Sequence, residues 1–218
     1  MQTPVIKWSY SALKEYVNCP RQYHETRVLK RYEKEATKQM LYGTEVHKAL
    51  EDYVNEGKPL LPNYTRFKKQ ADALAEIEGE KLTEFQMALD ANKNPCAWDE
   101  HWVRGIADLI IKDGDTAFIV DYKTGSNRFP DLKQLQLMAL MVFAHFPEIK
   151  VAKTALLFVV HEHFVPKDFK REDEARLWED FQPDLERLKL SFSTDKWQEN
   201  PTQLCRWCPV KDCQFHRG

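Results

Sequence analysis

Three charged side chains lie in a stretch of the sequence that otherwise resembles two buried strands. Asp108 belongs to the apolar run 106–111, and Asp121 and Lys123 end the run 118–123, with an Asp-Gly turn signal between the runs. Apolar residues occupy both faces of these strands, so we expect the hairpin in the middle of a sheet covered on both sides. Charges there cost free energy unless they are paired or bind a metal. They are therefore the first candidates for chemistry.

The length of the hairpin loop decides whether these side chains meet. Side chains alternate along a strand, so Asp121 and Lys123 point the same way. A two-residue loop at 113–114 places Asp108 diagonal to Asp121, and one at 114–115 places the two aspartates directly opposite. A three-residue loop separates them, because a shift of one residue moves every side chain to the other face. Two carboxylates beside an ammonium could hold Mg²⁺ or Mn²⁺ and polarise a water molecule.

A plainer alternative for these residues is structural. Asp121 and Lys123 could form an ion pair at a sheet edge, with Asp108 at a solvated strand end. The apolar runs around all three argue against an edge, because they indicate burial on both faces. We therefore favour a catalytic or metal-binding role.

Composition and charge limit the class of protein. The chain has 218 residues, of which 43% are hydrophobic and 30% charged, which is typical of a globular protein of one large or two small domains. Its formal net charge of −2 means that any nucleic-acid surface must be a local patch. No apolar run is long enough for a membrane span, and the N-terminal residues do not have the pattern of a signal peptide. We therefore expect an intracellular protein without a membrane partner.

The neighbouring segments supply two further polar candidates. Residues 39–56 predict an amphipathic helix that carries His47 beside its apolar side, and residues 65–91 predict a long helix. A buried helix from 130 to 146 carries Gln134 in its first turn, and an apolar strand at 151–161 follows it. The strand–helix–strand order indicates a parallel crossover. Without further evidence, His47 could be structural and Gln134 a polar residue at a helix end.

The C-terminal cysteines form a second constellation. Cys205, Cys208 and Cys213 lie within nine positions, and His216 follows them. Thiolates so close together bind zinc or an iron–sulfur cluster, whereas a disulfide framework is disfavoured in a reducing cytoplasm. Two ligand sets are open: the three cysteines with His216, or the three with Cys19. Cys19 by itself could equally be a buried, inert thiol.

Together these motifs resemble, in order, those of the PD-(D/E)XK nuclease superfamily, in its RecB-type exonuclease branch with C-terminal iron–sulfur cysteines. They are Ser-x-Ser…Cys-Pro-x-x-Tyr, Gly-x-x-x-His, Gly-x-x-Asp followed by Asp-x-Lys-Thr-Gly, Gln-x-x-x-Tyr with Met138 in the tyrosine position, and the cysteines, over residues 9–23, 43–47, 104–140 and 205–213. The resemblance implies an α/β fold with a central mixed β-sheet flanked by helices, as in restriction endonucleases. We expect a single nuclease domain over 1–218, with a mainly helical N-terminal part (1–95), the sheet core with the catalytic motifs (96–165), and a C-terminal helix and Cys-rich tail (166–218).

The resemblance also implies roles for particular residues. His47, Asp108, Asp121 and the Tyr122 backbone carbonyl would be ligands of Mg²⁺ or Mn²⁺, Lys123 would act on the attacking water, and Gln134 would position that water or Lys123. The resemblance further implies a 4Fe–4S cluster bound by one cysteine before the nuclease core and three after it. These are Cys19, Cys205, Cys208 and Cys213. The alternative is zinc bound by the three C-terminal cysteines and His216.

The implied activity is that of a metal-dependent DNA exonuclease, which hydrolyses phosphodiester bonds from DNA ends and prefers single strands. The chain most resembles the CRISPR-associated and phage recombination exonucleases of this branch, so a recombination protein or helicase is a candidate partner. Trp8 and Tyr10 could stack on bases. Basic residues near the N-terminus could follow the DNA backbone, namely Arg21, Arg27, Lys30, Arg31 and Lys34. The alternatives are a structure-selective endonuclease or nickase of the same fold, and a non-catalytic nucleic-acid-binding module.

Overall fold

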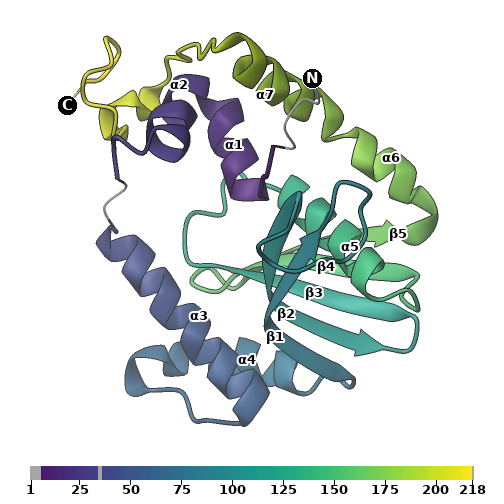
Figure 1. Cartoon of the computed structure of the whole chain (residues 1–218). Helices are drawn as coiled ribbons and strands as arrows, with labels where there is room; N and C mark the ends of the chain where they lie inside the picture. Colours follow the sequence, from purple (N-terminus) through teal and green to yellow (C-terminus); the bar gives the residue numbers. More distant parts are fainter. Residues whose placement is uncertain (1–5, 34–35, 218) are drawn as a thin grey trace. The chain divides into compact units, whose positions relative to one another are not determined.

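The computed structural model describes residues 6–33 and 36–217, and its cartoon is drawn in Figure 1. The chain forms two compact units. The first, the terminal unit, contains the described residues up to Ala36 together with those from Trp178 onward, and the second, the sheet unit, contains Thr37–Leu177. None of the described helices is both long enough and apolar enough to cross a membrane.

A five-stranded mixed sheet is the centre of the sheet unit, in the order β1-β2-β3-β4-β5. Neighbouring strands are antiparallel except β3 and β4, which run parallel and are joined through helix α5. The sheet and its helices confirm the predicted α/β class, and the parallel pair confirms the predicted crossover. The elements are β1 (Glu80–Leu89), β2 (Val103–Asp113), β3 (Thr116–Lys123), α5 (Lys133–His145), β4 (Val151–Phe158) and β5 (His163–Lys170).

Helices cover both faces of this sheet (Figure 1). On one face, helices α3 (Lys38–Glu56) and α4 (Lys68–Ala75), joined through the 3₁₀ turn Pro62–Phe67, bury an apolar cluster against β2, β3 and β4. On the other face lies α5, whose side chains are buried nearly all round, as the sequence predicts. The central hairpin β2–β3 is therefore covered on both sides, as its apolar runs predict.

Helix α3 follows from its own sequence. Thr37 caps its N-terminus, because the Thr37 hydroxyl accepts a hydrogen bond from the backbone N–H of Met40 at 3.2 Å. Val46 and Leu50 are fully buried one turn apart, which places His47 beside the buried stripe. Gly57 ends the helix in the left-handed conformation, with φ of 67°.

The β2–β3 hairpin has a two-residue loop at 114–115, one of the two loops for which the sequence predicts that Asp108 and Asp121 meet. Asp113 pairs with Thr116, so the loop is Gly114-Asp115, and Gly114 takes a left-handed conformation with φ of 57°. In this register Asp108 lies opposite Asp121, just beyond the last ladder pair of the two strands.

The prediction of one long helix over residues 65–91 is wrong. Helix α4 ends at Ala75, and residues 80–89 form β1, which pairs with β2. Gly79 makes the break, because its φ is 127° and a Cβ there would lie 2.4 Å from the carbonyl oxygen of Lys112. After it, Phe85 and Met87 alternate with polar residues as in a strand, and pairing with the apolar β2 outweighs the local helical spacing.

The terminal unit is helical and brings both ends of the described chain together. The Tyr16 hydroxyl of α1 donates a hydrogen bond to the carbonyl of Arg187 in α7 at 2.7 Å, and Arg21 of α2 forms an ion pair with Glu199 at 2.7 Å. Its elements are α1 (Tyr10–Asn18), α2 (Pro20–Tyr23), the π-helix His24–Val28, α7 (Gln182–Thr194) and the 3₁₀ helix Gln203–Trp207, while α6 (Glu174–Glu179) spans the boundary between the units. The single domain over 1–218 and its three parts remain predictions.

Candidate active site

The ladder between β1 and β2 is interrupted at one place, where Glu84 lies opposite Asp108. The pairs on both sides keep the same register, but Glu84 and Asp108 do not pair. Glu84 has a φ of 47°, a left-handed conformation that costs a residue with a Cβ about 1–2 kcal/mol. Such strain inside a strand is typical of functional sites, where the surrounding structure holds it in place.

The side-chain alternation of β2 also changes at Asp108. A Cβ on Gly105 would meet Met138 of α5 at 2.6 Å, whereas Leu109 packs in the cluster beneath α3 and α4. In a regular strand both residues would lie on one face. Beyond the end of the β2–β3 ladder, Asp108 Oδ2 accepts the backbone N–H of Tyr122 at 2.7 Å. The Asp108 carboxylate thus accepts the hydrogen bond that a backbone carbonyl of a neighbouring strand would otherwise accept from Tyr122.

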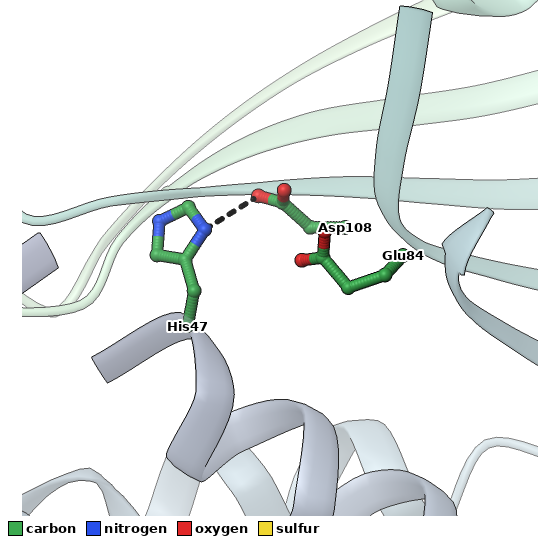
Figure 2. A group of neighbouring side chains, drawn as sticks. All are labelled: His47, Glu84 and Asp108. Carbon is green, nitrogen blue, oxygen red and sulfur yellow. Dashed lines mark ion pairs between the residues drawn. The ribbon is translucent and has the colours of Figure 1, made fainter. Parts of the chain in front are cut away.

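His47 and Glu84 approach Asp108 on the α3 side, as Figure 2 shows. His47 Nδ1 lies 3.5 Å from Asp108 Oδ2, and one ligand atom from each of the three residues lies within 4.8 Å of the others. The three line a cavity of about 360 Å³ together with Thr44, Lys48, Glu51 and Ile106. An imidazole and two carboxylates at this spacing can share a divalent cation.

The pKa values on this side reflect mutual charge and burial. Burial lowers the pKa of His47, but the hydrogen bond and the negative charge of Asp108 outweigh it and raise the pKa above its usual value. Burial raises the pKa of Glu84, and the charge of Asp108 raises it further. A bound metal ion would lower both pKa values, because its positive charge disfavours protonation of the neighbouring groups.

Gly43 allows α3 to come this close. It lies one turn before His47, and a Cβ on it would stand 3.1 Å from the hydroxyl oxygen of Thr124, the residue after Lys123. The glycine of the Gly-x-x-x-His motif therefore has a physical reason: it lets the helix that carries His47 pack against the end of the strand that carries Lys123.

Asp121, Lys123 and Gln134 form a closed group on the α5 side. Gln134 Nε2 donates to Asp121 Oδ1 at 2.6 Å, and Lys123 Nζ donates to Gln134 Oε1 at 3.0 Å. Lys123 Nζ also lies 2.5 Å from Asp121 Oδ2. The side of the sheet follows from alternation: Val120 and Tyr122, which flank Asp121 in the sequence, pack beneath α3 and α4, so Asp121 and Lys123 lie on the opposite face. One amide thus fixes both a carboxylate and an ammonium.

Asp121 is the most buried of the charged groups in this site, with 7% of its surface exposed. Burial raises the pKa of Asp121 to about 6, which the positive charge of Lys123 opposes and the negative charge of Asp108 reinforces. Its Oδ2 atom is fully buried and, within the described part of the chain, makes no hydrogen bond of regular geometry besides the Lys123 ion pair. An oxygen in that condition is suited to bind a cation.

The predicted site residues thus come together as two adjoining groups. His47 meets Asp108, and Asp121 meets Lys123 and Gln134, while Tyr122 connects the groups through its N–H to Asp108 and its ring, 5.6 Å from that of His47. Met138, where the family pattern has tyrosine, is 4% exposed and packs beside Gly105. The methionine therefore belongs to the core, in a position unsuited to substrate contact.

Glu84 is the residue that sequence reasoning missed. It lay in the segment assigned to a helix, so its position opposite Asp108 could not be inferred. The signal that could have shown it is the alternation of Phe85, Met87 and Leu89, which are apolar at every second position. Read as a strand, the same segment makes Glu84 a charged residue within an apolar run.

The cysteine constellation gathers around one cavity of the terminal unit. Cys19, Cys205, Cys208 and Cys213 all line a cavity of about 330 Å³, which His216 also lines. Burial raises the pKa of Cys208, and the charges of the three other cysteines raise it further. The two ends of the sequence thus contribute thiols to one place.

Two residues named for DNA contact are placed differently or lie outside the described residues. Trp8 is only 2% exposed, and its ring lies 5.8 Å from that of Phe181, so its predicted role in base stacking is wrong. The driving force is burial of a large aromatic surface, here beside Phe181, the residue before α7. Lys34 lies outside the described residues.

The mixed α/β fold with this group of carboxylates, histidine and lysine defines a metal-dependent nuclease. The model of the PD-(D/E)XK nuclease superfamily matches residues 7–213, and the chain belongs to this superfamily. No curated protein matches the sequence.

Solved structures share the fold at low sequence identity. The crystal structure of SSO0001 has a TM-score of 0.51 and 14% identity, and the match covers 97% of this chain and 88% of that one. The structure of a "putative exonuclease" from Eubacterium rectale has a TM-score of 0.50 and 11% identity, over 96% of this chain and 86% of the other. At such identities the likeness concerns the fold.

Proposed function

We propose that the protein is a metal-dependent DNA exonuclease of the RecB-type branch, which hydrolyses DNA from its ends and prefers single strands. The observation that carries the proposal is the position of Asp108. Its carboxylate lies between the His47 side and the Lys123 side of the sheet, 3.5 Å from His47 Nδ1 and 2.7 Å from the N–H of Tyr122. The family membership and the exonuclease name of one structural neighbour support the same reading.

The residues present fit a divalent cation. Asp108 and Asp121 supply the hard oxygen ligands that Mg²⁺ and Mn²⁺ prefer, His47 supplies a nitrogen that suits Mn²⁺ better, and Asp121 Oδ2 is buried without a regular hydrogen bond. The Tyr122 carbonyl and the Glu84 carboxylate are the further ligands we assign. A bound ion would lower the pKa of a water molecule and neutralise charge on the phosphate.

The protein's own groups prepare the reaction. Lys123 is held next to Asp121 by Gln134, so its side-chain nitrogen has one position from which to act on the attacking water. As an ammonium it orients that water, and only as the neutral amine could it take up the water's proton. Gln134 is a positioning residue, because its amide bonds both partners and its oxygen has no other role in the group. Asp108 is itself positioned by the backbone N–H of Tyr122.

Degradation of labelled single-stranded DNA in Mn²⁺ tests the proposal. Asp121→Ala should lower the rate about 10³-fold or more, since several kcal/mol of transition-state stabilisation depend on the cation. The matched control is Asp113→Ala, an exposed aspartate at the end of the same hairpin, which should leave the rate unchanged. Equal rates for Asp121→Ala and the wild type would refute the proposal that this site catalyses DNA hydrolysis.

The choice of substrate separates exonuclease from endonuclease. An exonuclease leaves covalently closed single-stranded circles intact, whereas a structure-selective endonuclease or nickase cuts them. Strands labelled separately at the 5′ and 3′ ends report the polarity, and a comparison with duplex ends reports the strand preference. If circles are cleaved as fast as linear strands, the protein is an endonuclease and the exonuclease proposal is refuted.

For the terminal unit we propose a 4Fe–4S cluster bound by Cys19, Cys205, Cys208 and Cys213. The support is that all four line one cavity and that Cys19 is among the neighbours raising the pKa of Cys208. The cluster would join the two ends of the chain and stabilise the unit. Anaerobically purified protein should be brown and contain iron, and Cys208→Ser should lose it while Cys96→Ser, outside this cavity, keeps it. Colourless protein containing zinc would instead assign the site to zinc, with His216 as a ligand.

A further inference from the structure

The loop between β3 and α5 connects the two halves of the α5-side group. It runs over residues 124–132, directly after Lys123 and just before the helix turn that carries Gln134. Its base is held closed, because Lys123 Nζ donates to Gln134 Oε1 at 3.0 Å. Whatever the tip of this loop presents to solvent is therefore tethered to the site.

The tip presents an aromatic ring. Phe129 is 92% exposed, more than any other large hydrophobic side chain in the described part of the chain. A single exposed apolar side chain is ordinary on a protein surface. The place of Phe129 distinguishes it: it lies five residues before Gln134, so its Cα is at most about 18 Å from that of Gln134.

The backbone limits where the ring can go. Phe129 precedes Pro130, which disfavours the helical conformation for Phe129 and fixes the φ of Pro130 itself near −65°. The loop also bends at Gly125, and Arg128 N–H donates to the Ser126 hydroxyl at 3.3 Å. The ring is thus presented by a short, partly restricted segment, which lowers the entropy lost when it contacts a ligand.

The loop offers one exposed cation beside the ring. Its charged residues are Arg128, which is exposed and lies next to Phe129 in the sequence, and Asp131, which is half-buried and accepts the backbone N–H of Lys133 at 3.3 Å. The carboxylates Glu84, Asp108 and Asp121 of the site would repel a phosphate chain, so a cation at its approach has a clear electrostatic use. A cation beside an exposed ring is the combination that binds single-stranded nucleic acid.

We propose that Phe129 stacks on an unpaired base next to the scissile phosphate, and that Arg128 contacts the phosphate of that nucleotide. The inference rests on the proposed nuclease function and deepens it by assigning the single-strand preference to this loop. A base inside a duplex is already stacked on both sides and offers no free face, whereas an unpaired base does. Every base has such a face, so the contact is independent of sequence.

Binding without cleavage tests the stacking. The probe is an oligothymidylate with a fluorescent label, at the 5′ end in one preparation and the 3′ end in another, in Ca²⁺ in place of Mg²⁺ or Mn²⁺. Phe129→Ala should weaken binding about 5- to 100-fold, the range found for loss of one stacked base. Phe129→Trp should bind as well as the wild type or better. The matched control is Phe164→Ala, a 53% exposed phenylalanine at the start of β5, which should bind like the wild type.

An abasic scan distinguishes stacking from a merely structural role. Single abasic residues are placed at successive positions of the oligothymidylate. One position should weaken wild-type binding as much as Phe129→Ala does, and at that position the variant should lose nothing more, because both changes remove the same contact. If no position shows this loss of additivity, or if Phe129→Ala binds like the wild type, the proposal is overturned.

The outcome is separable from that of the proposed function. The binding assay needs no hydrolysis, so stacking can be established on a protein whose nuclease activity is absent, and Asp121→Ala addresses the activity without changing the loop. A wild-type protein that binds no oligonucleotide overturns the stacking whatever its activity. An active nuclease on which Phe129→Ala has no effect on binding leaves the proposed function standing and removes only this inference.

Discussion

The two sides of the sheet hold halves of one site with opposite character. On the α3 side, His47, Glu84 and Asp108 line an open cavity, where burial and the charge of Asp108 raise the pKa of Glu84, and the pKa of His47 is raised by Asp108 against the opposing effect of burial. On the α5 side, Asp121, Lys123 and Gln134 form a closed group in which each residue bonds the other two. In the first half the one lysine that lines the cavity, Lys48, is paired with Glu51 and Asp52, whereas the second half holds Lys123 directly against Asp121.

This difference separates two tasks. A set of donors with excess negative charge and access to solvent is suited to an exchangeable ion. A buried group with fixed hydrogen bonds is suited to hold one ammonium at one place, because little reorganisation remains for the reaction. Asp108 belongs to both halves through His47 and Tyr122, so changes there and at Lys123 should have different signatures.

Asp108→Ala should have the largest effect. It removes the carboxylate that both halves share and leaves the N–H of Tyr122 without its acceptor. We expect nuclease activity below detection and Mn²⁺ affinity reduced at least about 10²-fold, measured by single-turnover cleavage and isothermal titration calorimetry. Asp115→Ala, in the hairpin loop, is the control for both measurements. Retention of wild-type Mn²⁺ affinity in Asp108→Ala would show that the two halves are independent.

Lys123→Ala should separate the two tasks. It removes the group that orients water, so we expect cleavage to fall about 10²- to 10⁴-fold. Mn²⁺ affinity should stay unchanged or rise, because the cation 2.5 Å from Asp121 Oδ2 no longer competes with the metal. The control is Lys150→Ala, an exposed lysine outside the site. A parallel loss of Mn²⁺ affinity would contradict the division into an ion half and a lysine half.

The sequence allowed the α5-side half to be predicted better than the α3-side half. Alternation along β3 correctly placed Asp121 and Lys123 on one face, and the Asp-Gly signal gave a hairpin with an even-numbered loop. These are local properties, which depend on neighbours within a few residues. Asp108, in contrast, departs from alternation at a break in β2, and simple counting along a strand cannot detect such a break.

Glu84 shows why the rest was out of reach. Residues 65–91 contain apolar residues at roughly helical spacing. What makes residues 80–89 a strand is pairing with β2, whose partner residues lie 14 (Leu89 with Val103) to 32 (Glu80 with Lys112) positions further along the chain. The close packing of Gly43 on Thr124 depends equally on a contact between distant segments. Local patterns predict elements, whereas the meeting of His47, Glu84 and Asp108 follows from tertiary packing.

Glu84→Gly tests whether strain is stored on the α3 side. Glycine adopts a φ of 47° without the penalty for a Cβ, so the free energy of unfolding should rise by about 1 kcal/mol. Mn²⁺ affinity should fall about 10-fold, because a ligand is lost. Chemical denaturation and calorimetry measure the two effects. Lys93→Gly is the matched control: Lys93 also has a positive φ, of 69°, and relief there should stabilise the protein without any change in Mn²⁺ affinity.

Gly43→Ala should give the smallest effect and reports on the spacing of the two halves. Alanine favours a helix over glycine by about 1 kcal/mol, but its Cβ would lie 3.1 Å from Thr124 Oγ1 and press α3 away from the residue after Lys123. Stability should therefore change little, while cleavage falls about 3- to 10-fold, since small displacements of reacting groups lower the rate. Thr124→Ala removes the crowded hydroxyl, so the double variant Gly43→Ala/Thr124→Ala should recover the rate of Thr124→Ala alone. If the double variant stays slow, crowding at Thr124 is not the cause of the loss. If Gly43→Ala itself cleaves at the wild-type rate, the close packing of α3 on this strand is unnecessary for catalysis.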